Sequence, residues 1–413
     1  MAIVKPFRAL RPNKNNAHLV ASVPYDVVNR EEAKQFAAGN DLSFLHVTRA
    51  EIDLPDDVNP YAKEVYEKAK KNLDKLKSSA PLVTDETPHY YLYRLIMDGR
   101  SQVGITATFA VDDYDNDVIL KHEKTRKVKE DDRTNHIVTT ESQTGVVFLT
   151  YRGTDLINSA VTETIKNEEP LYDFAAPDGI QHTIWILPDK YNQPVMDEFK
   201  KIDKIYVADG HHRAKSASRA REEKRKANPN HTGEEEYNFF IAVVFPADQL
   251  KILPYNRVVL ALNGKSKDLN EVSEKFEVSK SEIKEPEQKR SFGMYLDGEW
   301  YILKARDSVL ASNTLSKSVG DSLDVSILQN FLLTPVLGIE DVRTSDRIDF
   351  IGGIRGTNEL EKLVENGKAK VAFSMYPVSV DDLMRISDAG EVMPPKSTWF
   401  EPKLRDGLLT HLI

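Results

Sequence analysis

The sequence predicts an α+β protein that contains more than one packed unit. Strand-like and helix-like segments alternate, but they lack the regular strand–helix–strand spacing of a parallel sheet. Two hairpins, at 89–111 and 291–304, call for antiparallel strands. The chain has 413 residues, with 40% apolar and 29% charged residues, which is typical of a globular protein too long for one simple core.

The elements of the first part follow from local patterns. In the segment 40–50, SFLHVTR predicts a strand with a packed His46. Residues 60–77 place apolar groups at helical spacing on a charged background, which predicts a surface helix. Strands at 89–96 and 102–111 are joined by a turn in which Gly99 can adopt a positive φ. Further strands are predicted at 145–151, 182–187, 204–208 and 238–245, and helices at 192–203 and from residue 213.

The second part begins where the composition changes, near residue 263. A helix-then-strand pattern follows this point, and a hairpin turns at Asp297-Gly298. Residues 323–335 predict an apolar-faced helix, and the tail predicts a strand and then a helix. We therefore expect a core at 1–262 with insertions, a small α+β unit at 263–335, and a C-terminal segment at 336–413 that returns to the active site.

Charge and composition exclude several classes of protein. The formal net charge of −9 disfavours a nucleic-acid partner. The absence of cysteine removes thiol nucleophiles, disulfides and cysteine zinc sites. No apolar run reaches the ~18 residues of a membrane span, and the first residues do not resemble a signal peptide. We expect a cytoplasmic monomer or homodimer without a membrane partner.

The first chemical motif is the corner IYVADGHHRA at 205–214. A strand that enters a helix through glycine exposes backbone N–H groups, and these favour a phosphate at the helix N-terminus. His211, His212 and Arg213 can add bonds to phosphoryl oxygens. Asp209 can cap the helix or hold a hydrated Mg²⁺. The alternative is a helix cap followed by solvated polar residues.

Two other motifs carry groups suited to the same chemistry. His122 and Glu123 follow a strand, and Glu123 can serve as a general base if its surroundings tune it. A charged surface helix explains that run equally well. In MPPKST, Lys396, Ser397 and Thr398 form a compact anion-reading cluster, although a solvated loop rich in proline is the plain alternative.

Two further charged residues, Asp26 and Arg257, have neighbours in the sequence that bear on their role. Asp26, in Pro-Tyr-Asp, fits a plain turn before a helix better than a second acid in a site. Arg257 lies among apolar strand residues, so it needs a partner, either a phosphate or a structural carboxylate.

The motifs together resemble a known group of proteins. The strand–DGHHR–helix corner resembles the nucleotide-binding corner of the ParB/sulfiredoxin-like fold, and the DGHHR box is most similar to that of the free-serine kinases. The boxes PFRALRP, HEKTR, LPYNRVV and MPPKSTWFEPK resemble a bacterial and archaeal domain-of-unknown-function family over nearly the whole chain. Trp399 and Phe400 stand where the kinases have a basic pair, so part of their contact with the amino acid is not reproduced.

This resemblance implies a ParB/sulfiredoxin-like mixed-sheet core and phosphoryl transfer from ATP or ADP to a small hydroxyl acceptor, above all free L-serine. It implies that 209–213 bind the nucleotide with Mg²⁺ near Asp209. Glu123 would take the acceptor's proton, and His122 would orient Glu123 or contact the nucleotide. Lys396, Ser397 and Thr398 would close over the acceptor.

Two other functions remain open at this point. One is a ParB-like regulator that binds a nucleotide without transferring phosphate. The other is a metal-dependent hydrolase built on His122, His211 and His212. Sulfiredoxin chemistry is excluded because it needs a cysteine, which the chain lacks.

Overall fold

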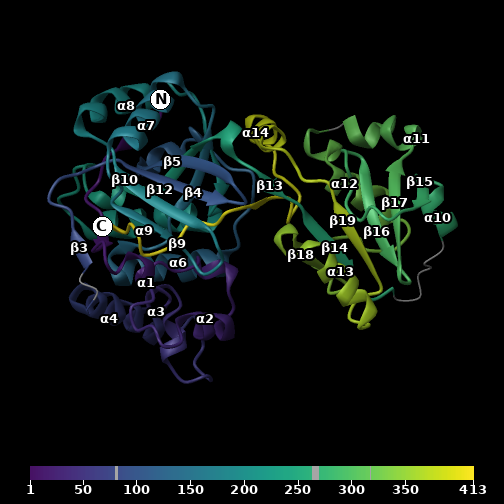
Figure 1. Ribbon diagram of the computed structural model, residues 1–413, viewed down its shortest axis with the longest axis horizontal. Helices are drawn as coiled ribbons and strands as arrows, with labels where there is room; N and C mark the ends of the chain where they lie inside the picture. The colour runs from purple at the N-terminus through teal and green to yellow at the C-terminus, as the bar shows by residue number, and fades with distance from the viewer. Residues whose placement is uncertain (80–81, 263–268, 317) are drawn as a thin grey trace. The chain divides into compact units, whose positions relative to one another are not determined.

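The computed structural model describes residues 1–79, 82–262, 269–316 and 318–413 (Figure 1). Contacts divide the chain into two units. Unit 1 comprises Met1–Leu250 and Pro402–Ile413, and unit 2 comprises Lys251–Glu401. Within the described ranges, none of the helices has the length and apolar character that crossing a bilayer requires.

Unit 1 is built on a mixed sheet of nine strands, in the order β6-β11-β8-β12-β5-β4-β10-β9 with β1 beside β5. The pairs β11–β6 and β12–β8 are parallel, and the other neighbours are antiparallel. The strands are β1 (Val4–Lys5), β4 (Tyr91–Met97), β5 (Arg100–Ala110), β6 (Ile119–Leu120), β8 (Val147–Tyr151), β9 (Tyr172–Ala175), β10 (Gln181–Ile186), β11 (Ile205–Asp209) and β12 (Phe239–Pro246). A mixed sheet within an α+β protein is therefore confirmed.

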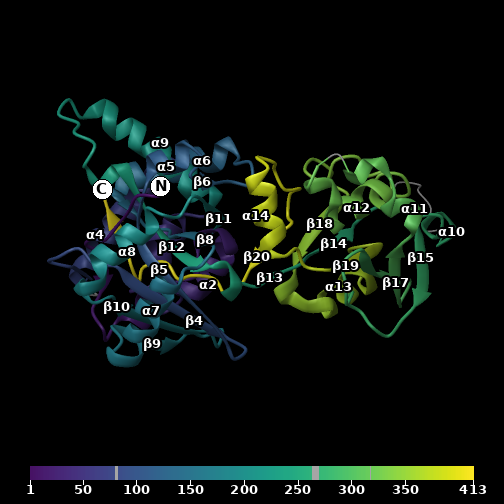
Figure 2. The same ribbon diagram turned by 90° about the horizontal axis from the view of Figure 1, so that it is seen from above.

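Helices cover the apolar face of this sheet. Residues at alternate positions of the central strands, such as Ile105 and Phe109 in β5, form one buried cluster with apolar groups of α5, α7, α8 and α9. Helices α5, α6 and α9 lie side by side (Figure 2). The helices are α1 (Ala17–Val20), α2 (Arg30–Ala37), α3 (Leu45–Thr48), α4 (Lys63–Ser79), α5 (Val111–Asp115), α6 (Lys127–Thr140), α7 (Asp155–Asn167), α8 (Asn192–Phe199) and α9 (His211–Ala227).

Most of the elements predicted for unit 1 are confirmed. The hairpin of β4 and β5 turns at Asp98 and Gly99, both with positive φ, as its two-residue turn requires. The expected strand around His46 is wrong. These residues form α3, because Leu45 and Val47 reach separate buried clusters, and Val47 packs with Leu73 of α4.

Unit 2 contains an antiparallel sheet in the order β15-β17-β16-β19-β14-β18. One face of this sheet packs on α13 (Gly356–Glu365) through Leu360. The strands are β14 (Tyr255–Val259), β15 (Phe276–Lys280), β16 (Ser291–Leu296), β17 (Glu299–Ala305), β18 (Ile348–Gly352) and β19 (Val371–Met375). The other helices are α10 (Leu269–Ser273), α11 (Asp307–Leu310), α12 (Asp324–Leu328) and α14 (Val380–Asp388), and β13 (Ile252–Leu253) pairs with β20 (Trp399–Phe400).

The division into units differs from the expected boundaries at 262 and 335. Strands from both sides of each expected boundary share the sheet of unit 2, since β14 precedes residue 262 and β18 and β19 follow residue 335. The expected start of the small unit, at 263, lies outside the described residues. Residues 402–413 belong to unit 1, where the yellow end of the chain is labelled C in Figure 1.

Candidate active site

The corner at 209–213 joins β11 to α9. Gly210 has φ +93° and ψ 31°, a left-handed conformation that an L side chain rarely adopts. The helix begins directly after it, at His211, and its N-cap residue, Gly210, offers no side chain to its first N–H groups. Asp209 therefore does not cap α9, contrary to one of our expectations. The open N-terminus is suited to an anion.

Strand pairing brings His122 and Glu123 to this corner. Strand β6 runs parallel to β11, with Leu120 opposite Tyr206, so the carboxyl ends of both strands lie at the same edge of the sheet. The residues that follow β6 therefore lie beside those that follow β11. Glu123 Oε2 is 3.6 Å from His211 Nδ1. The two motifs that the sequence separates by about ninety positions thus form one cluster.

His122 and His211 form a buried pair. Their rings lie perpendicular, with centroids 4.4 Å apart. Burial lowers the pKa of His122 to about 4. Burial, followed by the nearby His122, lowers the pKa of His211 well below its ordinary value. Both imidazoles are consequently neutral at pH 7, and each can still donate one N–H.

Neither ring has its hydrogen bonds filled by the protein. Among the described residues, His211 Nε2 and both ring nitrogens of His122 are buried without a hydrogen-bond partner. Glu123, by contrast, keeps about half of its side chain exposed. A ligand at the corner would meet polar groups that lack partners beside an accessible carboxylate.

His212 has a different role in the geometry. Its Nε2 accepts the backbone N–H of Arg126 at 3.0 Å, so the proton of the neutral ring is on Nδ1. Burial and then the charge of Arg126 lower the pKa of His212. His212 therefore ties the start of α6 to the start of α9.

Asp209 forms an ion pair that the sequence did not reveal. Lys403 Nζ lies 2.8 Å from Asp209 Oδ2. Burial raises the pKa of this carboxyl, but Lys403 and Arg213 outweigh burial and hold it well below its ordinary range. Lys403 is the last residue of the box MPPKSTWFEPK, 194 positions from Asp209. Only the tertiary fold makes it part of the site.

Arg213 points inward from α9 rather than toward open solvent. Its Nη2 contacts Asp26 Oδ2 at 2.8 Å, and its Nη1 donates to the carbonyl of Val146 at 2.6 Å. Asp26 lies in a short 3₁₀ turn, Tyr25–Val27. The turn that the sequence predicts there is present, but Asp26 is also the partner of Arg213.

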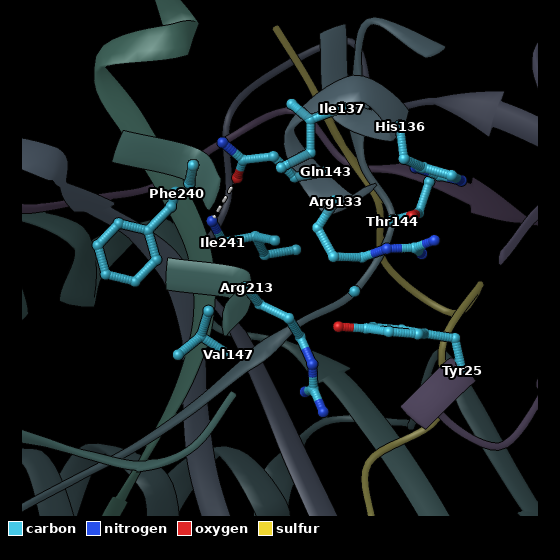
Figure 3. Close-up of a pocket in the computed structure, with 12 residues that line it drawn as sticks. Tyr25, Arg133, His136, Ile137, Gln143, Thr144, Val147, Arg213, Phe240 and Ile241 are labelled. Carbon is cyan, nitrogen blue, oxygen red and sulfur yellow. Dashed lines mark hydrogen bonds between the residues drawn. The ribbon is translucent and has the colours of Figure 1, made fainter. Parts of the chain in front are cut away.

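A small cavity lies beside Arg213 (Figure 3). Arg133 and Arg213 both extend toward the ring of Tyr25, at 4.1 Å and 6.0 Å from its centroid. The cavity has a volume of about 20 Å³, enough for about one water molecule. A cavity of this size does not hold a nucleotide.

The third predicted motif belongs to unit 2. Lys396 has a positive φ of 55°, and Ser397 Oγ donates to the carbonyl of Pro394 at 2.6 Å. Lys396, Ser397 and Thr398 are thus not among the residues that unit 1 brings together. Their participation in one site with the corner stays a prediction.

The described residues contain no group of three or more His, Asp or Glu side chains arranged to hold a metal ion. The ligand set of the hydrolase alternative is therefore not assembled in the described ranges. Lys403 donates to Oδ2 of Asp209, and Oδ1 is the second carboxylate oxygen of this residue. Mg²⁺ commonly binds through one or two carboxylates and substrate phosphates, so this donor fits such an ion only together with a nucleotide.

Comparison with known families decides where the chain belongs. The profile of the family described as "Protein of unknown function (DUF1015)" matches residues 4–326. The chain is a member of the DUF1015 family. This confirms the family that the sequence boxes resemble, while its description assigns no activity. A search of curated proteins gives no match.

Several solved structures are similar to this DUF1015 chain at low identity. A conserved hypothetical protein from Pyrococcus furiosus is 13% identical, with 74% of this chain and 94% of that chain covered and a TM-score of 0.35. A free serine kinase in complex with AMP is 14% identical, covering 74% and 91%, with a TM-score of 0.33. SbnI with a C-terminal truncation, from Staphylococcus aureus, is 12% identical, covering 74% and 87%, with a TM-score of 0.38. A TM-score below 0.5 does not establish a shared fold.

Proposed function

We propose that this DUF1015 chain is a phosphotransferase that moves a phosphoryl group from ATP or ADP to the hydroxyl of a small acceptor, with free L-serine as the acceptor we favour. The observation that carries the proposal is the cluster at the corner. There, the exposed carboxylate of Glu123 lies 3.6 Å from His211, at the uncapped N-terminus of α9.

The residues of the cluster supply what phosphoryl transfer needs. This reaction depends mainly on positioning and charge neutralisation. In the proposal, the backbone N–H groups of 210–213 hold the phosphates, and the neutral rings of His122 and His211 donate to phosphoryl oxygens. Lys403 adds a positive charge beside Asp209. Arg213 acts indirectly, because Asp26 and the carbonyl of Val146 hold its guanidinium inward.

The chemical step uses Glu123 as the base. Its carboxylate accepts the proton of the acceptor hydroxyl, and the acceptor oxygen forms a bond to the transferred phosphorus. The bond from that phosphorus to the leaving nucleotide oxygen breaks, and the nucleotide departs with one phosphate fewer. Asp209 would hold Mg²⁺, which neutralises phosphate charge when bound.

The proposal also includes the fold family, the acceptor-binding residues and the location that the resemblance implies. The mixed sheet with its strand–DGHHR–helix corner supports a ParB/sulfiredoxin-like core in unit 1. Lys396, Ser397 and Thr398 would contact the acceptor. A cytoplasmic monomer or homodimer without a nucleic-acid partner remains our expectation.

The test is an assay with L-serine, Mg²⁺ and either ATP or ADP, in which O-phosphoserine is measured by mass spectrometry. We expect Glu123→Gln to lower turnover by about 10²-fold or more, because loss of a general base has that size of effect. Its affinity for nucleotide, measured by calorimetry, should stay within about twofold of wild type. Glu222→Gln, on the exposed side of α9, is the matched control.

Two outcomes would contradict the proposal in different ways. Turnover by Glu123→Gln near the wild-type rate would show that Glu123 is not the base. Tight nucleotide binding with no phosphoserine or other phosphorylated acceptor would instead favour the nucleotide-responsive regulator.

A further inference from the structure

Arg257 is a buried cation at the centre of the sheet of unit 2. It lies on β14, between β18 and β19, and its neighbours in register are Phe350 and Phe373. Its side chain contacts the ring of Phe350, with 5.4 Å from the guanidinium carbon to the ring centroid. Only 3% of the residue is exposed. An arginine in such a position needs a compensating partner.

The partners of Arg257 are neutral. Its Nη1 donates to the carbonyl of Tyr255, and its Nη2 donates to the carbonyl of Lys396 at 3.1 Å. No carboxylate among the described residues forms an ion pair with it. Burial lowers the pKa of Arg257 to about 9. The structural carboxylate that we considered from the sequence is therefore not found, and the need for an anion remains.

Lys396 is a second cation beside the first. Its carbonyl accepts from Arg257, and its Nζ lies 5.2 Å from the ring centroid of Tyr255. Within the described ranges, Lys396 also has no carboxylate partner. Its φ of +55° is unusual for a residue with a side chain, and such backbone conformations cluster at functional sites. Both cations therefore contact Tyr255, Arg257 through its carbonyl and Lys396 through its ring, and neither has a carboxylate partner among the described residues.

We propose that Arg257 and Lys396 form an oxyanion-binding site in unit 2, which takes the carboxylate or phosphate group of a small molecule. Two of the five guanidinium N–H groups serve the carbonyls, and the remainder are available to an oxyanion. An oxyanion would supply the counter-charge that the protein does not. Its assignment to the carboxylate of the acceptor rests on the proposed function, whereas anion binding itself does not.

The competing explanation is that Arg257 is only a clamp between two carbonyls. A clamp needs N–H donors but no charge, and it gives Lys396 no role. Glutamine keeps amide donors and removes the charge, so Arg257→Gln and Lys396→Gln separate the two explanations. Lys396 is exposed, so its variant should fold even if Arg257→Gln does not.

Calorimetric titration of the full chain with inorganic phosphate, L-serine and O-phospho-L-serine, each separately, tests the site. We expect the wild type to bind at least one of the three. Lys396→Gln should weaken that binding at least fivefold and Arg257→Gln at least tenfold. Lys304→Gln, an exposed lysine on β17, should leave it unchanged. If these two substitutions weaken the binding of L-serine, the site takes a carboxylate. If they weaken the binding of inorganic phosphate, the site takes a phosphate.

The proposal is overturned if the wild type binds none of the three ligands, or if Lys396→Gln binds them as tightly as the wild type does. Arg257→Gln, where it folds, must agree with Lys396→Gln. His211→Ala identifies the share of phosphate binding that belongs to the corner of unit 1. If the corner binds no nucleotide, the proposed function fails. Weaker anion binding by Lys396→Gln would then still support the oxyanion site in unit 2. If only the site of unit 2 is wrong, ADP binding and Glu123-dependent turnover persist.

Discussion

At the scale of single residues, the fold changes the ionisation of the buried carboxyl of Asp406. Its backbone N–H and carbonyl both bond to Ser22, and only 2% of the residue is exposed. Burial raises the pKa of this carboxyl to about 7. Arg213 lowers it, Asp26 raises it, and Arg133 lowers it. The same low-dielectric interior that keeps His122 neutral therefore also opposes ionisation of Asp406.

This burial predicts a specific pH dependence of stability. Asp406 titrates near pH 7 when folded and near pH 4 when unfolded, so the folded state binds more protons between these values. The free energy of unfolding should fall with rising pH in this window, by up to ~1.4 kcal/mol per pH unit. The contribution is present in full below about pH 4 and is lost above about pH 7.

Urea unfolding of wild type and Asp406→Asn from pH 5 to pH 8 measures this effect. The depressed pKa of His122 acts in the opposite direction, because it lowers stability as the pH falls below about 6.5. Because both proteins contain His122, its contribution cancels in the difference between their free energies of unfolding. We expect Asp406→Asn to gain stability relative to wild type as the pH rises, while the exposed Asp203→Asn follows the wild type. Parallel profiles for Asp406→Asn and wild type would contradict the assignment.

At the scale of elements, the corner between β11 and α9 depends on Gly210. Any L side chain at its φ of +93° is strained, and a Cβ there would lie 3.3 Å from Arg213 Nη1. Gly210→Ala should therefore lower the free energy of unfolding by about 1–2 kcal/mol. It should also weaken nucleotide binding, if the corner holds phosphate.

Gly179→Ala is the matched control for this substitution. Gly179 has a similar φ of +81°, but a Cβ there would meet no atom within 4 Å. The stability that Gly179→Ala loses measures the backbone strain alone. The additional stability that Gly210→Ala loses measures the displacement of Arg213. Chemical denaturation gives both values. Equal stability of Gly210→Ala and wild type would show that the corner relaxes freely.

At the scale of the whole molecule, unit 1 needs the last twelve positions of the chain. Residues 402–413 return to it after the whole of unit 2. Arg405 pairs with Asp178 and contacts His182 Nε2 at 3.3 Å, and His411 Nε2 lies 2.8 Å from Glu236. The pKa of His182 is lowered to about 3, first by burial and then by Arg405. The C-terminal segment is thus part of the interior rather than a loose tail.

A chain that ends at residue 250 should accordingly be less stable than unit 1 within the full chain. It loses the partners of Asp178, Glu236 and Asp209 together. We expect a peptide of residues 402–413, added in excess, to raise its Tm in thermal unfolding, since a ligand of the folded state stabilises it. A peptide carrying Arg405→Ala is the control and should raise Tm less. No response to either peptide would contradict this account.

Local patterns in the sequence were sufficient for the α+β class, most of the elements and the residue types of the corner. Hairpin turns and helical periodicity are local, so Asp98-Gly99 and the α4 pattern could be interpreted directly. The family boxes linked Glu123 to the DGHHR corner through the residue types and their order in the chain. The strand predicted at α3 was wrong because its residues are β-branched or aromatic in part, while burial against α4 favours the helix.

The pairing of distant groups, in contrast, depends on the tertiary fold. The parallel pairing of β6 with β11 places Glu123 beside His211, and the return of 402–413 places Lys403 on Asp209. The fold also leaves Arg257 bonded to carbonyls rather than to a carboxylate. These outcomes depend on strand order and on long-range burial, and no local pattern in the sequence encodes them. The sequence by itself thus determines which chemical group each residue carries. The fold determines which groups become its neighbours, and these neighbours change its charge and its hydrogen bonds.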